Sequence, residues 1–344
     1  MPISVNKIND ILVATLDKAP TAKFTEVITR DFQHDVYKQW FKKESERISG
    51  GTKNMETIAT RSNNAARLTT LFDNDSVSIT DMFSTVEVPW AYADTHWAFD
   101  IRERFMNSGG KQIVDVIRTR RWDAIVSLAK LLEKLAWSVP DPAEEKAPFG
   151  IPYWIVKDKR EGFYGLRPEG FSHVGNIDPV KEEGWRNWTA AYKDVSDDDL
   201  LEKMRRAYRH LQWSPPEMVD GLRHESHKNY RIYVNDETYG KLAKLQRNQR
   251  MDIGWDLYNV ENEPTFRGHT IVYTQELDND ESCPVYMVNH DVIGARVMKG
   301  DVFNETPPER LYNSHYAYAG WVNLTFAFFC TNRARHAVVA KSID

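Results

Sequence analysis

Two histidines and a glutamate stand close together at His224-Glu225-Ser226-His227, a combination that can bind zinc or perform acid–base hydrolysis. Zinc proteases place two histidine ligands four residues apart on one helix, so that both side chains face the metal. Here the histidines are three residues apart and no third ligand is in view. A solvated loop is the favoured interpretation, and a hydrolase that uses residues 224–227 remains an alternative from another class of protein.

A second cluster, Asp278-Asn279-Asp280-Glu281-Ser282, is as acidic as a calcium-binding loop. Such a loop has a glycine at its sixth position and a closing glutamate in phase, and this run has neither, so a turn is favoured. The sequence also lacks the motifs G-x-S-x-G, G-x-x-x-x-G-K-[ST] and G-x-G-x-x-G, which mark hydrolase nucleophiles and phosphate-binding loops. It therefore predicts no catalytic residue, no metal ligand and no cofactor, and indicates a protein that is not an enzyme.

The composition predicts a soluble globular protein. Its 344 residues are 41% hydrophobic and 28% charged, which predicts one large or two medium cores. A mean hydropathy of −0.58 without a long apolar run argues against a membrane span. Cys283 and Cys330 form no C-x-x-C pair, and the N-terminal residues do not look like a signal peptide, so a reducing cytoplasm is expected.

Charge and aromatic content indicate which partners the protein has. A formal net charge of −5 gives no broad attraction to phosphate backbones, so any contact with DNA should be weak and non-specific. The chain contains 11 Trp, 15 Tyr and 15 Phe. Because aromatic side chains are enriched in interface cores, this content favours extensive assembly, although a large core would also use them.

The clearest local pattern is a long helix over residues 111–137. Its apolar side chains recur at three-to-four spacing, which places them on one helix face: Val114, Ile117, Ile125, Leu128, Leu132 and Leu135. Glycines at 109 and 110 precede it, and prolines at 140 and 142 follow it. At 1.5 Å per residue the helix should be roughly 40 Å long, so it can act as the spine of a domain.

Before this helix, residues 53–71 and 77–101 have the composition of two long strands joined by a turn at 73–76. The first strand is polar, and the second holds a series of aromatic residues: Phe83, Trp90, Tyr92, Trp97 and Phe99. A two-stranded ribbon alone is marginally stable in water, so this hairpin should rest on something else. A hairpin that reaches onto a partner is favoured, and a hairpin folded back on its own core is the alternative.

The remaining segments predict an α+β fold. Residues 1–20 hold a short amphipathic segment, and 23–48 suggest an arm on a neighbouring surface or subunit, or else a plain surface helix. Residues 149–188 are dense in turns, and Ser196 can cap a second helix. A strand at 229–234, a helix through Leu245, strands at 265–273 and 284–289 and a strand-rich block at 316–339 follow without repeated βαβ spacing.

The order of these parts resembles the major capsid proteins of tailed bacteriophages, in the Hong Kong-97-type shell fold shared with encapsulins. Local sequence supports the resemblance: FGIPYW with GFYGLRPEGF and GWRNW, then RIYVNDETYGKLAKL, FRGHTIVY and VYMVNHDVIGARVMKGDVF. It implies an N-terminal arm at 1–48, an extended hairpin loop at 49–108, a peripheral domain with the spine helix at 109–148, an axial domain at 149–319 and a C-terminal return at 320–344. In that family the hairpin lies over an adjacent subunit.

The resemblance implies a structural protein that assembles itself as hexamers and pentamers into an icosahedral shell around double-stranded DNA. This shell is the capsid of the virion, and it is assembled in the host cytoplasm. An encapsulin-like cargo shell is the alternative within the fold. A separate scaffolding protein is expected because the arm starts near residue 1, or else the N-terminus is processed. A portal would be a further partner, and a decoration protein is a candidate partner. No lysine lies between Asn54 and Ser108, which speaks against a lysine–asparagine cross-link from this hairpin. The expected inter-subunit contact residues are Arg61, Asn63, Phe72, Phe83, Trp90 and Trp97.

Overall fold

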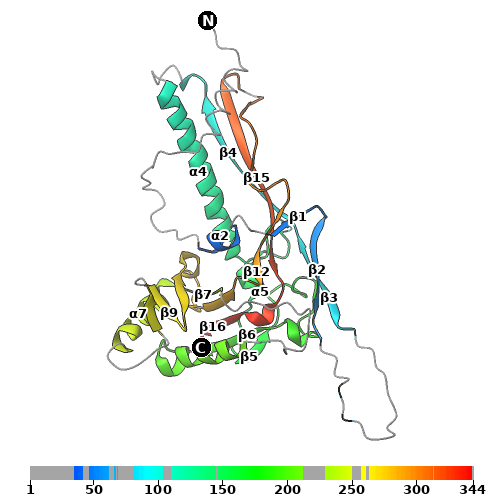
Figure 1. The fold of residues 1–344 in the computed structure, drawn as a ribbon, viewed down its shortest axis with the longest axis vertical. Coiled ribbons are helices and arrows are strands. Elements are labelled where there is room, and N and C mark those ends of the chain that lie inside the picture. Colours follow the sequence, from blue (N-terminus) through cyan, green and yellow to red (C-terminus); the bar gives the residue numbers. More distant parts are fainter. Residues whose placement is uncertain are drawn as a thin grey trace. The chain divides into compact units, whose positions relative to one another are not determined.

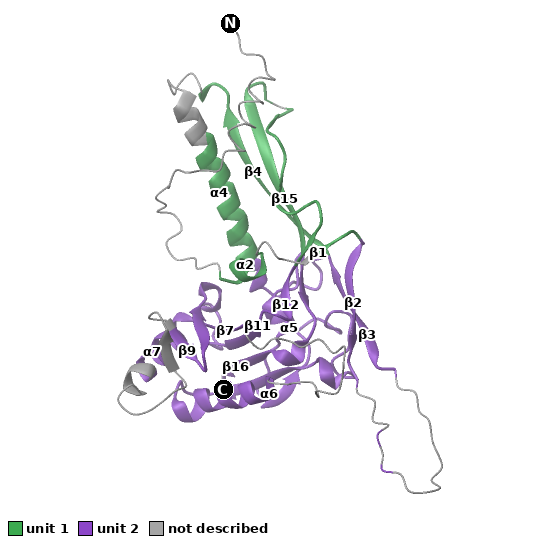
Figure 2. Cartoon of the chain, in the orientation of Figure 1, with its two compact units in different colours: residues 1–50, 90–134, 296–326 green, residues 51–89, 135–295, 327–344 purple. Residues whose placement is uncertain are grey.

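The computed structural model describes residues 35–41, 46–61, 81–103, 110–144, 146–211, 229–249, 257–260, 263–312 and 314–342, together with 66 and 68. The chain divides into two compact units, which Figure 2 colours separately. Unit 1 contains Met1–Gly50, Trp90–Lys134 and Arg296–Phe326, and unit 2 contains Gly51–Pro89, Leu135–Ala295 and Ala327–Asp344. Each unit combines helices with sheet strands, so the predicted α+β class is confirmed (Figure 1).

Unit 1 is organised by the long helix α4 (Gly110–Ala136), which confirms the helix predicted over 111–137. Its end is sharp because the N–H and hydroxyl of Ser138 both donate to the carbonyl oxygen of Leu135, and Pro140 follows. The apolar face of the helix packs on a sheet, where Ile117 and Ala124 join a cluster with Trp97, Phe99 and Tyr318. Helix and sheet therefore share one core.

The sheet of unit 1 is built on strand β4 (Ala91–Asp100) and the long strand β15 (Ala317–Cys330). They run antiparallel, from Ala91 opposite Phe326 to Asp100 opposite Ala317. The short strands β13 (Asn304–Glu305) and β14 (Glu309–Arg310) also pair with β15, and β1 (Glu46–Ile48) pairs in parallel with β12 (Ile293–Met298). Side chains alternate along β4, so Trp97 and Phe99 are buried whereas Tyr92 and His96 are exposed.

The single strand predicted over 77–101 is wrong, because the chain forms two strands there, β3 (Phe83–Pro89) and β4. Strand β3 pairs with β2 (Lys53–Ala59), whereas β4 pairs with β15. Proline has no N–H to donate to a ladder, which suits Pro89 to the end of a strand. The predicted first strand, 53–71, contains β2, and most residues between 62 and 80 lie outside the described residues.

Of the predicted N-terminal arm, the structure describes 35–41 and 46–48. Helix α2 (Asp35–Trp40) buries Val36 and Trp40, and the backbone N–H of Tyr37 donates to Glu133 Oε2 of α4 at 2.7 Å. The ring of Phe41 contacts the rings of Tyr37, Phe303 and Phe326, and the ring of Tyr37 also contacts that of Phe303. This part of the arm therefore packs on its own chain.

Unit 2 contains an eight-stranded mixed sheet. In spatial order its strands are β5 (Gly162–Gly165), β6 (Asn187–Tyr192), β16 (Ala337–Lys341), β11 (Val285–Asn289), β7 (Tyr230–Val234), β10 (His269–Tyr273), β9 (Glu263–Phe266) and β8 (Leu257–Val260). One face packs against η2 (Asp197–Leu201), α6 (Glu202–Leu211) and α7 (Asp236–Gln249) in a single apolar core. On the other face Trp137 contacts Tyr233 and Tyr286. Burial on both faces explains why strands β7 and β11 are nearly continuous apolar runs.

Other predicted elements of unit 2 are mostly confirmed. Ser196 caps the second helix, since its hydroxyl accepts the N–H of Asp199 at 3.3 Å, and the strands at 229–234 and 284–289 are β7 and β11. The single strand predicted at 265–273 is wrong. There Arg267 and Gly268 both have positive φ angles, 50° and 83°, which turn the chain between β9 and β10.

The domain boundaries predicted from the sequence fall at other points than the boundaries of the two units. The predicted limit at 319 lies inside β15, whose ladder with β4 runs without a break through this position. The predicted hairpin domain, 49–108, is divided between unit 2, which holds the paired strands β2 and β3, and unit 1, which holds β4.

Candidate functional site

Strands β2 and β3 form an antiparallel ribbon in unit 2, with Lys53 opposite Pro89 and Ala59 opposite Phe83. Its inner face rests on the same unit. Val86 and Val88 are buried, and the N–H of Glu87 donates to the carbonyl oxygen of Gly175 at 3.1 Å. A Cβ at position 175 would lie 2.8 Å from Val86, so the ribbon sits tightly against this glycine. The described part of the hairpin therefore does not depend on a partner for support of this face.

The outer face of the ribbon has the opposite character. Met55 is 58% exposed and Phe83 is 62% exposed, and between them Thr57 lies opposite Thr85. These side chains present apolar and uncharged surface to solvent. At the Lys53 end of the ribbon, Lys53 forms an ion pair with Glu87 at 3.1 Å. The outer face is a candidate docking surface.

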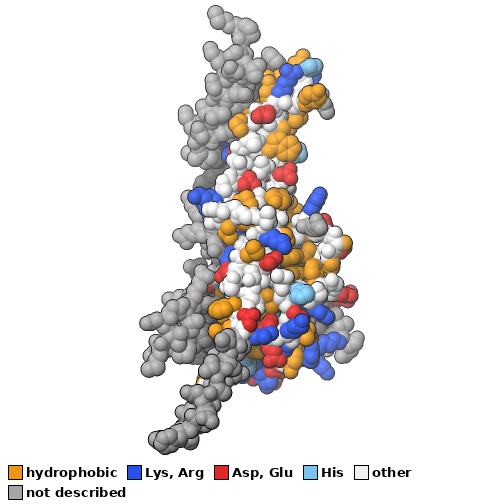
Figure 3. All heavy atoms as spheres, turned by 90° about the vertical axis from the view of Figure 1, so that its right-hand side faces the viewer, with side chains coloured by type: hydrophobic (Ala, Val, Ile, Leu, Met, Phe, Trp, Pro, Cys, Tyr) orange, Lys and Arg blue, Asp and Glu red, His pale blue; other side chains and the backbone are white. Residues whose placement is uncertain are grey.

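Unit 1 carries a second exposed aromatic face, on the side of β4 and β15 opposite to α4. Tyr92 is 77% exposed and Trp321 is 40% exposed. His96 lies opposite Trp321 in the ladder, with ring centroids 5.0 Å apart. In the coloured part of Figure 3, hydrophobic side chains appear among charged ones. Neither Tyr92 nor Trp321 was selected from the sequence as a contact residue, although strict alternation along β4 was the available signal.

The turn between β14 and β15 adds three more exposed apolar side chains to unit 1. Tyr312 is fully exposed, and Leu311 and Tyr316 are exposed beside it. The guanidinium of Arg102 lies 4.7 Å from the centre of the Tyr316 ring, which is a cation–π contact. This tip is another surface on which a partner could pack.

The expected inter-subunit residues occupy three kinds of place. Phe83 is exposed on the outer face, and Arg61 is half exposed but bound to Glu182 of its own chain. Trp90 and Trp97 are 6% and 2% exposed, so the core of the chain takes up most of their surface. A contact of either residue with another subunit stays a prediction, and it would use only the small part of the side chain that is exposed. Asn63 and Phe72 lie outside the described residues.

Acidic residues of the turn at 278–282, which could bind a metal or act in catalysis, form hydrogen bonds within the chain. In the acidic turn, Asp278 accepts hydrogen bonds from the N–H of Asp236 and the hydroxyl of Tyr273, and Asp280 accepts from Ser282 and Lys157. Within the described ranges no group of three His, Cys, Asp or Glu side chains could hold a metal ion. His224 and His227 lie outside those ranges.

A buried arginine, which sequence reasoning missed, holds unit 2 together. Arg333 is 0% exposed, and its guanidinium donates to five acceptors: the carbonyl oxygens of Trp154 (2.6 Å), Leu166 (3.0 Å), Trp185 (2.8 Å) and Gly165 (3.3 Å) and the Oδ1 of Asn187 (3.2 Å). Burial lowers the pKa of Arg333 to about 10. Because solvent does not reach this guanidinium, its role is structural rather than catalytic.

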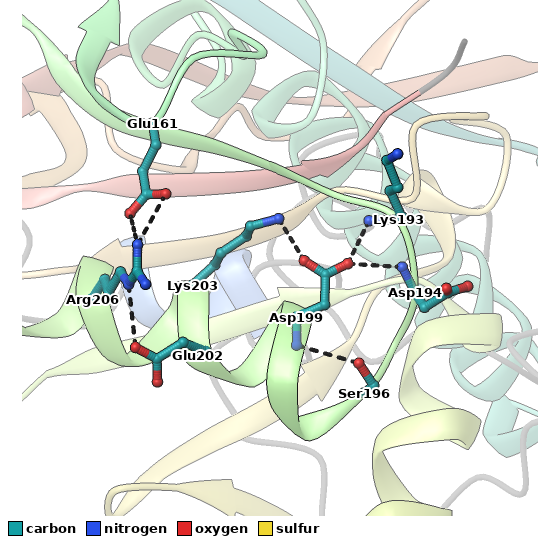
Figure 4. A network of polar contacts seen from close by, with 8 residues as sticks. All are labelled: Glu161, Lys193, Asp194, Ser196, Asp199, Glu202, Lys203 and Arg206. Carbon is teal, nitrogen blue, oxygen red and sulfur yellow. Dashed lines mark hydrogen bonds and ion pairs between the residues drawn. The ribbon is translucent and has the colours of Figure 1, made fainter.

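The polar face of α6 offers little free positive charge. Arg206 donates to Glu161 at 3.1 Å and to Glu202 at 3.2 Å, and Lys203 binds Asp199, as Figure 4 shows. Arg205 and Arg209 also lie within ion-pair distance of carboxylates. Paired charges of this kind attract phosphate weakly. None of the helices in the described part of the chain combines the length and apolarity needed to cross a bilayer.

At the level of sequence, no family model and no curated protein matches the chain. Solved structures are similar along nearly its whole length. The cyanophage A-1(L) capsid subunit has a TM-score of 0.59 at 11% identity, covering 95% of this chain and 98% of that one. The capsid of the empty GTA particle has a TM-score of 0.57 at 10% identity, with 95% and 96% covered. The capsid of Myoviridae phage XM1 has a TM-score of 0.54 at 11% identity, with 99% of both chains covered.

The similarity extends over nearly the whole length of the chain, so it includes segments of both compact units. At about one identical residue in ten, the likeness concerns the fold. The chain therefore has the α+β fold of phage capsid proteins.

Proposed function

We propose that this chain is the major capsid protein of a tailed bacteriophage. It would assemble itself as hexamers and pentamers into an icosahedral shell that encloses double-stranded DNA. The observation that carries the proposal is the capsid fold over nearly the entire chain. The exposed apolar surfaces on both units supply the contacts that an assembling subunit needs.

In this proposal the elements take the roles of a Hong Kong-97-type subunit. Helix α4 is the spine of the peripheral domain, the eight-stranded sheet with α6 and α7 is the axial domain, and β2 with β3 begins the extended loop. The loop lies over an adjacent subunit. The outer face of the ribbon, with Met55 and Phe83, then meets a partner whose exposed aromatic face carries Tyr92 and Trp321.

A structural role also accounts for the chemistry of the chain. Asp278 and Asp280 of the acidic turn accept hydrogen bonds from the same chain, and solvent does not reach the buried Arg333. The cations of α6 are paired, which suits a container whose contents must slide rather than bind tightly. Scaffold, portal and decoration proteins would be the partners of such a shell. The shell would assemble in the host cytoplasm and form the capsid of the virion.

An encapsulin-like cargo shell is the second candidate, because an encapsulin from Synechococcus elongatus shares the fold at a TM-score of 0.50 and 8% identity, with 99% and 96% of the two chains covered. The two candidates differ in contents and not in subunit fold. DNA inside the shell would favour the capsid, and a packaged enzyme would favour the encapsulin.

Electron microscopy of the purified chain tests the proposal. We expect closed icosahedral shells built from hexamers and pentamers, and nuclease-protected double-stranded DNA in particles recovered from infected cells. Shells that hold a protein cargo and no DNA would replace the first candidate by the second. A chain that stays a compact monomer at high concentration, in every assembly condition tried, would overturn both.

A further inference from the structure

The end of the ribbon nearest Ala59 and Phe83 is fixed to the body of unit 2 by an arginine–glutamate pair. Arg61 follows β2 by two residues, and its Nε donates to Glu182 Oε2 at 2.8 Å while its Nη2 donates to Oε1. The two groups therefore meet as a fork on a fork, the geometry in which arginine binds carboxylate most specifically. The Glu182 side chain is only 11% exposed, so solvent screens its side of the pair poorly.

The backbone around this pair leaves little room for another arrangement. A Cβ at Gly184 would lie 2.7 Å from the carbonyl oxygen of Thr60, so the turn that carries Glu182 touches the end of β2 directly. The N–H of Thr60 donates to the carbonyl oxygen of Met82 at 3.0 Å, and the hydroxyls of Thr60 and Ser84 are 3.0 Å apart. Both strands of the ribbon are thus joined at the point where the body holds them.

Charges near the pair favour its ionised form. Hydrogen bonds from Arg61 lower the pKa of Glu182, although burial of the carboxylate and, to a smaller extent, the neighbouring Asp178 oppose this effect. The carboxylate of Asp81 acts on Arg61 in the same sense as Glu182 and raises its pKa. At neutral pH the ion pair is therefore fully charged on both sides.

We infer that Arg61 and Glu182 form a latch that holds the ribbon in its binding position on the subunit before subunits meet, which makes both of them positioning residues for shell assembly. This inference rests on the proposed function. Only one face of this ribbon is buried, so without the ion pair the end nearest Ala59 and Phe83 would sample many directions. Holding that end in the subunit removes an ordering cost from each contact, and a shell repeats the contact at every subunit.

The latch is tested by Glu182→Gln, which keeps the shape of the side chain but removes its charge, and by Arg61→Lys, which keeps the charge but removes the fork. Asp158→Asn is the matched control, because Arg160 forks onto Asp158 in the same unit, through Nε at 3.0 Å and Nη2 at 2.8 Å. The reversed pair, Arg61→Glu with Glu182→Arg, should restore the contact.

Hydrogen exchange of the isolated subunit gives a readout that does not depend on assembly. We expect amides in peptides 53–61 and 83–89 to exchange about fivefold faster in both latch variants, since a half-exposed pair contributes modestly, and the control to match the wild type. The thermal midpoint should stay within the range of the control. Exchange that is unchanged in the latch variants would overturn the inference.

Assembly of the same proteins gives the second readout. We expect the subunit concentration needed for shells to rise several-fold in the latch variants, and to return toward the wild-type value in the reversed pair. A wild-type chain that forms no shells would refute the proposed function, while the exchange experiment would still decide whether the latch holds the ribbon. Faster exchange with unchanged assembly would show that the pair does not position the ribbon for contacts.

Discussion

In the core of unit 2 the Nδ1 atom of His336 accepts a hydrogen bond from the backbone N–H of Asn289, at 3.1 Å. A nitrogen that accepts carries no proton, so the neutral ring holds its proton on Nε2, which faces the Sγ of Cys330 at 3.6 Å. His336 is 0% exposed, and burial, aided by the charge of Arg333, lowers the pKa of His336 to about 3. The fold thus requires a neutral imidazole at this position.

This requirement predicts how stability depends on pH. Above a pH of about 6.5, His336 is neutral in the folded and the unfolded chain, and its contribution is complete. As the pH falls from there toward 3, the unfolded chain takes up a proton that the folded chain cannot, so stability falls by about 1.4 kcal/mol per pH unit. His336→Gln should weaken this dependence between pH 7 and pH 4.5, measured by urea unfolding. His173→Gln, at an exposed histidine, is the control, and an equal slope in both variants would contradict the prediction.

Arg333 should tolerate neither methionine nor lysine. Arg333→Met leaves carbonyl oxygens of Trp154 and Trp185 buried without a donor, and each such group costs about 1–3 kcal/mol. Lysine carries its donors on one nitrogen and cannot reach acceptors on all sides of a planar fork. Denaturant unfolding should show a loss of about 3 kcal/mol or more for either variant. Arg167→Met, at an exposed arginine, should change the free energy of unfolding by about 0.5 kcal/mol or less.

Glu133 should decide whether helix α2 stays on helix α4. Glu133 is 6% exposed, and its carboxylate accepts the N–H of Tyr37 in the first turn of α2, where backbone donors lack partners within the helix. Glu133→Ala removes that acceptor, and peptide 35–41 should lose protection from hydrogen exchange by about tenfold. Lys134→Ala, at the exposed next position of α4, should leave the peptide protected. Equal protection in both variants would mean that the aromatic contacts of Tyr37 and Phe41 hold α2 without the carboxylate.

The outer face of the ribbon should matter for assembly and not for the fold of the subunit. Met55→Asp with Phe83→Asp places two charges on side chains that are already solvated, so the thermal midpoint should move little. In a shell these charges would be buried in the contact, and a cost of ~1.4 kcal/mol per contact raises the required subunit concentration tenfold.

Light scattering during assembly measures this effect. Val139→Asp, at an exposed apolar residue just after α4, serves as the comparison for a charge placed elsewhere on the surface. If the ribbon variant unfolds while the surviving fraction still builds normal shells, the outer face packs within its own subunit.

The sequence by itself determined the elements whose signals are local. The three-to-four spacing over 111–137 and the prolines after it gave α4, because a helix is specified by neighbours within one or two turns. The hydroxyl of Ser196 and the acidic residues after it marked the start of the next helix in the same way. The order of these elements was enough to suggest a capsid fold, which the structural likeness supports along the whole chain.

The tertiary structure decided what depends on residues far apart in the sequence. Nothing local shows that Trp97 packs on α4 beside Tyr318, that Arg61 meets Glu182, or that the single aromatic strand changes partner after Pro89. An aromatic side chain has the same local pattern in a core and in an interface, and an arginine has the same pattern whether it is solvated or buried. Which of these it becomes is set by the surface and the acceptors that the folded chain brings to it, so burial and pairing emerge only when the strands and helices are placed in three dimensions.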